Sequence, residues 1–251
     1  MRTIDEINRA LERLWRECPK DIPRPYAPVL RTKARPDGVV FVGLNPSASQ
    51  KGWASVMRKA GRAEPSNVLE YFAWPPPVSF DEAVAHELEE LARQHYGYFQ
   101  VHRDVGQLPG VHWSHLDLFA YRETESVDLL PRMLKSPHGD ELTAFGEAQF
   151  VLFEQLLDLA KPRAVVVISA RASRIYLHRR KPTLDPRLGC YRDLIDERKD
   201  VPVLFSETLS GRGMLGAFGR QRLCWHIGQV LGIEHLPPLR PQGRRLPERR
   251  R

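Results

Sequence analysis

The sequence of 251 residues has only three cysteines and contains no run of 18 apolar residues. The cysteines are Cys18, Cys190 and Cys224, which lie far apart, so a four-cysteine zinc or iron–sulfur site within one chain is excluded. The lack of a long apolar run excludes a transmembrane helix. The N-terminal stretch MRTIDEINRALERLW is acidic and amphipathic, unlike a signal peptide. Together with the scarce cysteines, this predicts a cytoplasmic protein with no membrane partner.

Positive charge is concentrated at one end of the chain. The net charge is +7, and residues 237–251, PPLRPQGRRLPERRR, hold six arginines and one glutamate, so the other residues carry only +2. This tail cannot bury enough apolar surface to fold, and we expect it to be disordered. Two interpretations of the tail are open: its arginines bind phosphates without sequence preference, or the tail only aids solubility or reflects genomic composition. We therefore expect one domain over residues 1–236, followed by a basic tail over 237–251.

Four segments have the pattern of strands, namely 39–42, 111–119, 164–168 and 201–205. Three of them are uninterrupted apolar runs, which is typical of strands buried on both faces of a parallel sheet. Helical spacing or capping motifs predict helices near 4–17, 53–59, 67–72, 79–92, 140–161, 169–178 and 217–231. Residues 97–110, 120–139 and 181–200 are interpreted as loops. The expected fold is a three-layer α/β/α sandwich around a central, mostly parallel four-stranded sheet.

Two loops stand out because each follows a predicted strand at the same end of that sheet. The first is GLNPSAS, residues 43–49, and the second is ETLSGRGMLG, residues 207–216. Ligands of open α/β sheets bind in the crevice outside the carboxyl ends of the strands. We therefore expect Asn45 and the hydroxyl of Ser47 to face such a crevice.

The two loops together resemble the motifs of the uracil-DNA glycosylase superfamily. Gly43-Leu44-Asn45-Pro46 is similar to its first motif, G-x-[ND]-P, and Thr208-Leu209-Ser210-Gly211 is similar to its second, [HN]-P-S-[GP]. The segments LDLFAYRET (116–124) and AVVVISARASRIY (164–176) are similar to the regions around its second strand and before its second motif. The resemblance extends over about residues 38–232 and is nearest to the mismatch-specific branch, which has no iron–sulfur cluster.

The resemblance implies an enzyme without a cofactor that flips a damaged base out of DNA and hydrolyses its N-glycosidic bond. Asn45 would position the attacking water, and Thr208 would support departure of the base. The base pocket would be formed by backbone near the first motif, a stacking ring and two polar groups of the second strand, that is by Gly43, Leu44, Pro46, Ser47, Trp53, Tyr71, Phe72, His115 and Asp117. The alternative for His115 and Asp117 is a buried pair, bonded to each other, that only orients the end of the strand. DNA would be held or wedged open by Arg171, Ser210, Gly211, Arg212, Met214 and Leu215.

Two departures from the family pattern keep a second function open. Thr208 replaces the His or Asn of the second motif, and a hydroxyl cannot carry the positive charge that a histidine can. Leu209 replaces the proline. The leading hypothesis is a monomeric, monofunctional glycosylase that removes uracil or hypoxanthine from DNA. The alternatives are a relative that binds nucleic acid without cleaving it, and a hydrolase of free nucleosides or nucleotides.

Overall fold

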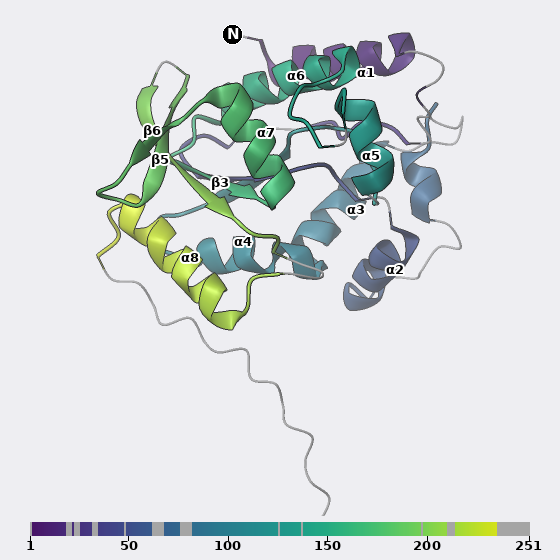
Figure 1. Cartoon of the computed structure of the whole chain (residues 1–251). Coiled ribbons are helices and arrows are strands. Elements are labelled where there is room, and N and C mark those ends of the chain that lie inside the picture. The colour runs from purple at the N-terminus through teal and green to yellow at the C-terminus, as the bar shows by residue number, and fades with distance from the viewer. Residues whose placement is uncertain are drawn as a thin grey trace, which may run out of the picture.

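The computed structural model describes residues 2–18, 22, 26–31, 35–47, 49–61, 68–75, 82–124, 126–136, 138–196, 198–209 and 214–234. The predicted tail over 237–251 therefore lies outside the described residues. At the centre is a sheet in the order β2-β1-β3-β6-β5-β4, with helices on both of its faces (Figure 1). The α/β class is confirmed, whereas the prediction of four strands was wrong because the described sheet has six and is mixed.

The four predicted strands form the parallel part of the sheet. They are β2 (Trp113–Asp117), β1 (Val39–Gly43), β3 (Ala164–Ile168) and β6 (Arg198–Ser206), adjacent in that order. Every residue of β1 and β3 is buried, because these strands lie inside the sheet with helices on both faces. The edge strand β2 alternates instead, with Leu116 facing one layer and Trp113 packing on the other. All four carboxyl ends open at one edge of the sheet.

The two additional strands are antiparallel and arise from residues that we interpreted as a loop. β4 (Thr183–Asp185) and β5 (Cys190–Ile195) form a hairpin that pairs with β6. Their many polar residues and Pro186 hid this hairpin, since edge strands tolerate both. The carboxylate of Asp193 on β5 is buried, and it accepts a hydrogen bond of 2.6 Å from Tyr176 Oη and one of 3.0 Å from Arg180 Nε. These bonds fasten the hairpin to a helix on the same face.

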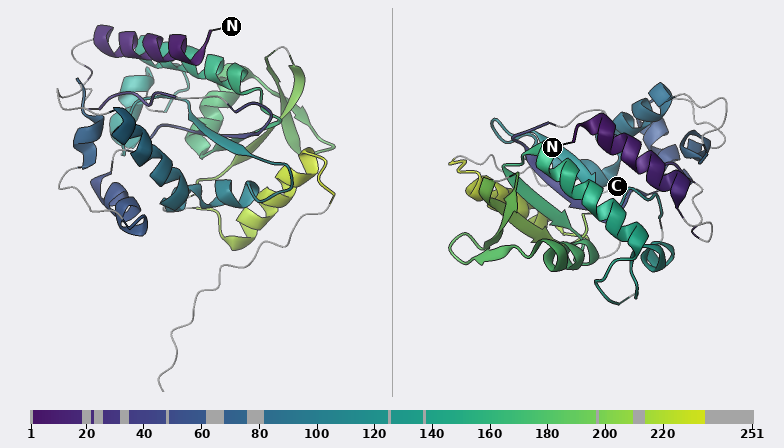
Figure 2. Two further views of the ribbon diagram at one scale, coloured as in Figure 1. Left: turned by 180° about the vertical axis from the view of Figure 1, so that it is seen from behind. Right: turned by 90° about the horizontal axis from the view of Figure 1, so that it is seen from above.

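One face of the sheet is covered by α1 (Ile4–Glu17), α5 (Ser126–Met133), α6 (Ala144–Ala160) and α7 (Ala170–Arg180), and the other by α4 (Gln100–Val105) and α8 (Ala217–Val230). Figure 2 shows α1 and α6 side by side above the sheet. The capping box predicted at Thr3 is present at the start of α1. By contrast, α4 and α5 lie in segments that we interpreted as loops, and this prediction was wrong. Both segments contain glycines or prolines, and their apolar stripes are short.

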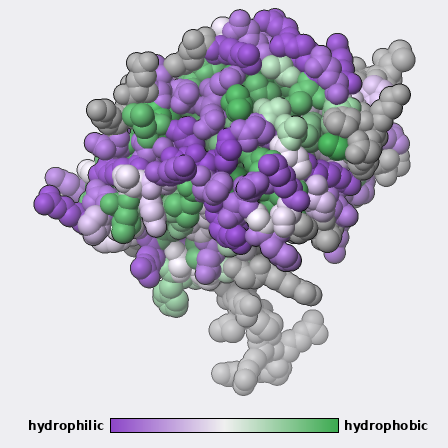
Figure 3. Space-filling model, turned by 45° about the horizontal axis from the view of Figure 1, so that its top comes forward, coloured by the Kyte–Doolittle hydropathy of each residue, from purple (hydrophilic) through white to green (hydrophobic). Residues whose placement is uncertain are grey.

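A third group of elements packs beside the sheet, near the carboxyl ends of β1 and β2. It comprises α2 (Gln50–Lys59), the 3-10 helix η1 (Val68–Phe72), α3 (Glu82–His95) and the 3-10 helix η2 (Gly97–Phe99). Trp53, Phe72 and Leu88 form the centre of its own apolar cluster. On the face shown in Figure 3, hydrophilic residues dominate and apolar residues emerge as separate patches. Among the described residues, no helix combines the length and apolar character needed to cross a membrane.

Candidate functional site

A cavity of about 440 Å³ lies where the loop after β1 meets the end of β2. We call it the loop cavity. Its polar residues include Asn45, His115 and Asp117. Its aromatic residues are Trp53 of α2 and three that follow α3, namely Tyr96, Tyr98 and Phe99. The volume is within the range of small-molecule sites, and a lining of aromatic rings with a few polar groups is typical of such sites.

The side chain of Asn45 connects this loop to the chain beyond β2. Its amide nitrogen donates to the carbonyl oxygens of Pro46 (3.2 Å), Tyr121 (3.2 Å) and Glu123 (2.7 Å). Glu123 N in turn donates to Pro46 O at 3.0 Å. Because carbonyl oxygens only accept, these three contacts fix which amide atom is nitrogen. The remaining atom, Oδ1, is therefore the one that Asn45 can offer to a ligand or a water molecule.

Gly43 makes room for the carboxylate of Asp117. The two residues are paired across β1 and β2, and a Cβ at position 43 would lie 2.4 Å from Asp117 Oδ1 and 3.1 Å from His115 Nε2. No real Cβ approaches an oxygen so closely. The glycine of the first loop is therefore required by the polar groups of the neighbouring strand.

Behind Asp117 lies a chain of two histidines. His115 Nε2 is 3.2 Å from Asp117 Oδ1, and His115 Nδ1 is 3.1 Å from Nε2 of His102, whose side chain is fully buried. An ionised carboxylate can only accept, so His115 Nε2 donates, and in neutral His115 the Nδ1 atom accepts from His102. Both ring nitrogens of His115 are thus occupied, which leaves Asp117 as the member of the chain that can act on a ligand.

Burial determines the charge of His102, the innermost residue of this hydrogen-bonded network. It lowers the pKa of His102 well below its usual value, and the neighbouring His115 and Arg103 lower it further, so His102 is neutral near pH 7. Burial also raises the pKa of Tyr98, with the charge of Asp117 as the next cause. Asp117 itself faces the guanidinium of Arg31, whose Nη2 lies 3.9 Å from Oδ2.

The aromatic residues predicted to stack on a base take different places. Trp53 lines the loop cavity, and its ring packs 5.0 Å from that of Phe72. Phe72 lies behind Trp53 and under the guanidinium of Arg122, 4.3 Å from it, and is not part of the cavity wall. Tyr71 is not part of it either. The other rings of the wall, on 96–99, were missed because Gly97, Gly106 and Gly110 made 97–110 resemble a loop.

The predicted second motif lies apart from the loop cavity. Thr208 O accepts a hydrogen bond of 3.0 Å from Leu215 N, and the Leu209 side chain is buried in the apolar layer beneath α8. Leu215 packs against that layer, while Met214 is exposed. Neither these residues nor Arg171, whose Nη1 donates to Gly139 O at 3.3 Å, line the cavity. Ser210, Gly211 and Arg212 lie outside the described residues.

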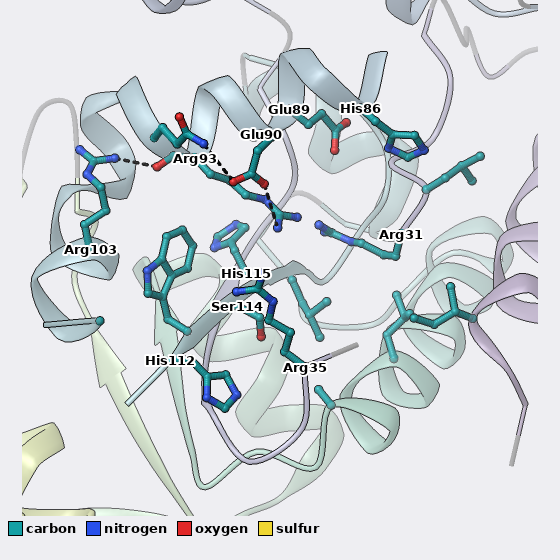
Figure 4. Close-up of a pocket in the computed structure, with 18 of the residues that line it drawn as sticks. Arg31, Arg35, His86, Glu89, Glu90, Arg93, Arg103, His112, Ser114 and His115 are labelled. Carbon is teal, nitrogen blue, oxygen red and sulfur yellow. Dashed lines mark hydrogen bonds and ion pairs between the residues drawn. The ribbon is translucent and has the colours of Figure 1, made fainter. Parts of the chain in front are cut away.

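A second, larger cavity of about 860 Å³ adjoins the first along the edge strand β2. We call it the arginine cavity, because Arg31, Arg35, Arg93 and Arg103 line it (Figure 4). The two cavities have common walls, since four residues line both of them, namely Arg31, Glu89, Arg93 and His115. The sequence pattern gave no indication of this cavity, because its arginines come from three separate segments.

Comparison with protein-family models and with curated proteins finds no match to this chain. Within the described residues there is also no group of three or more His, Cys, Asp or Glu side chains arranged to hold a metal ion.

Proposed function

We propose that this protein hydrolyses the N-glycosidic bond of a deaminated base, uracil or hypoxanthine, in DNA. The observation that carries the proposal is the composition of the loop cavity. Asn45, Pro46 and Ser47 of the first loop line the same space as Trp53 and the polar residues His115 and Asp117 of β2. Asn45 was selected from the sequence as the residue that positions water and the other five as parts of the base pocket, although the six extend from position 45 to position 117.

The proposed reaction needs one water molecule and one proton acceptor. Water can donate one hydrogen to Asn45 Oδ1 and the other to Asp117, which directs an oxygen lone pair toward the sugar carbon. As the C–N bond breaks, its electron pair leaves with the base and the sugar acquires oxocarbenium character. The water oxygen then bonds to that carbon, and its proton passes to the carboxylate of Asp117. The departing base takes up a proton from solvent and Asp117 releases the one it accepted, so one water molecule is consumed and the products are the free base and an abasic sugar.

The walls of the cavity supply the remaining requirements. The aromatic residues offer faces on which a flipped base can stack, a contact worth ~1–3 kcal/mol per base in nucleic-acid sites. Arg31, beside Asp117, places a positive charge where the departing base becomes negative. The hydrogen-bonded network of Asn45 holds the loop in place before the substrate arrives, so little reorganisation is needed during the reaction.

The second candidate function is binding of nucleic acid without cleavage. It is favoured by Thr208, which lacks the charge of the family's histidine and does not line the loop cavity. Under this alternative the cavity would hold a base, and no reaction would follow.

The experiment that decides between them uses labelled oligonucleotides carrying one uracil, hypoxanthine or xanthine, single- and double-stranded, with EDTA and an alkaline step that breaks abasic sites. Wild type is run beside Asn45→Ala. Strand breakage by wild type, with a loss of at least ~100-fold in the variant, supports the glycosylase, since a positioned water accounts for effects of that size. Unchanged cleavage by the variant refutes the role of Asn45. No cleavage but salt-sensitive retention of the probe favours the binding protein.

A further inference from the structure

Among the described residues, three arginines of the arginine cavity have no hydrogen-bond partner for their guanidinium groups. Arg31, Arg35 and Arg93 line the cavity, and within the described ranges none of their guanidinium nitrogens donates a hydrogen bond. The contacts that they do make are long, 3.9 Å from Arg31 to Asp117 and 4.0 Å from Arg93 to Glu90. Figure 4 shows these three side chains extending into the same space, Arg31 and Arg35 from the segment before β1 and Arg93 from α3.

The neighbouring arginines and carboxylates are bonded, which sets these three apart. Arg103 donates to the carbonyl oxygens of Arg93 (2.8 Å) and Tyr96 (3.2 Å), and Arg122 pairs with Glu89. Glu90 accepts a hydrogen bond from the Gln94 side chain, 3.4 Å long. Glu89 and Glu90 are therefore already engaged, while no guanidinium donor of Arg31, Arg35 or Arg93 is used in a hydrogen bond within the part of the chain that the structure describes.

Of the three arginines, Arg31 has the largest cost of removal from water. Its side chain is only 12% exposed, and a buried cation is costly unless it is paired and hydrogen-bonded. Burial lowers the pKa of Arg31, and repulsion from Arg93 is the next cause. A guanidinium has five N–H donors in a planar fork that matches the oxygens of carboxylate or phosphate. What would satisfy the cluster is an anion with several oxygens.

We propose that Arg31, Arg35 and Arg93 form a binding site for a phosphate group. Arg31 and Arg93 also line the loop cavity, so a phosphate bound to them would lie next to a base held there. This geometry fits the phosphate that belongs to the same nucleotide, or to its neighbour in a strand. The assignment of the phosphate to a nucleotide rests on the proposed function, whereas the anion site itself rests on the arginines.

The test measures binding rather than cleavage. The probes are inorganic phosphate, deoxyuridine 5′-monophosphate, deoxyuridine, and a labelled single-stranded 12-mer without a damaged base. The variants are Arg31→Gln with Arg93→Gln, and Arg35→Gln alone, which changes an exposed side chain and so leaves folding intact. The matched control is Arg16→Gln, at an exposed position of α1 whose one ion pair within the described ranges is with Glu12, at 3.9 Å.

For the wild type we expect phosphate to raise Tm and the 12-mer to bind with salt-sensitive affinity. The double variant should lose the Tm shift and bind the 12-mer at least ~10-fold more weakly, with a shallower salt dependence, since each lost phosphate contact removes about 0.7 from the slope for single strands. Arg35→Gln should show a smaller loss and Arg16→Gln none. If binding of the monophosphate depends on the arginines and binding of the 12-mer does not, the phosphate site is supported, and the phosphate that it binds belongs to a free nucleotide.

The site is refuted if no phosphate-bearing probe binds the wild type, or if the double variant binds them all as tightly as the wild type does. These outcomes differ from a failure of the proposed function. Arginine-dependent binding without release of any base would reject the glycosylase and keep the phosphate site. Release of a base with unchanged binding by the double variant would reject the phosphate site and keep the glycosylase.

Discussion

The two cavities share a wall but differ in how their polar groups are satisfied. In the loop cavity, Asn45 makes three hydrogen bonds to backbone and Asp117 is held by His115. In the arginine cavity, the guanidinium groups of Arg31, Arg35 and Arg93 donate no hydrogen bond within the described residues. The polar groups of the loop cavity are therefore held in place before a ligand binds, as a catalytic site requires. The arginine cavity instead presents guanidinium donors that can bind an anion.

Asp117→Asn should have the largest effect, because it should reduce release of base without reducing the binding of phosphate. The amide has nearly the same shape but cannot accept the proton of water, so we expect release of base to fall by ~10²–10⁴-fold, the usual contribution of a general base. Binding of inorganic phosphate should be retained or strengthened, because Arg31 loses its nearest negative charge. Single-turnover assays and the Tm shift with phosphate measure the two effects. Full activity of the variant would remove Asp117 from the mechanism.

Gly43→Ala tests the close packing of the loop cavity. The added methyl would displace Asp117, at a cost of ~1–3 kcal/mol in the free energy of unfolding if overpacking is relieved by a backbone shift. We expect a loss of activity together with reduced stability. The matched control is Gly97→Ala, since no heavy atom lies within 4 Å of the Cβ that it would add. Denaturant unfolding of both variants checks the prediction, and equal stability of the two would contradict it.

His102→Gln should have the smallest effect and should act through pH. The folded-state pKa of His102 lies well below that of an unfolded histidine, near 6.5, so below that pH the unfolded chain takes up a proton that the folded chain does not. Stability is therefore complete above about pH 6.5 and falls as the pH decreases. Glutamine can still donate to His115 but does not titrate, so Tm should fall less between pH 7 and pH 5. His178→Gln, at an exposed position of α7, provides the control and should retain the wild-type profile.

The sequence predicted the parallel strands well because their apolar runs are dictated by burial on both faces. The bounds of β3 were correct to the residue, and the capping box of α1 was recognised. It did not reveal β4 and β5, because a polar hairpin at a sheet edge has no alternation strong enough to distinguish it from a loop. The helix α5 contains Pro131, which concealed it in the same way.

The candidate site was predictable where its residues are close in sequence and not where folding alone joins them. Asn45 and Ser47 lie in one loop, and the alternation of β2 placed His115 and Asp117 on one face. His102 and Arg31 could not be found by such reasoning, because their importance depends on contacts with His115 and Asp117. A pattern of three rings and a histidine at 96–102 was the available signal. The glycines around it favoured a loop.

The bonds of Asp193 determine how far the cooperative unit of this molecule extends. If β5 separated from the sheet while α7 stayed in place, Tyr176 and Arg180 would lose their carboxylate partner inside the protein. Arg180 also binds Glu154 of α6, at 2.9 Å, so the hairpin is linked through α7 to a second helix. We therefore expect that β4 and β5 do not unfold separately. They should unfold together with the parallel strands, as one cooperative unit.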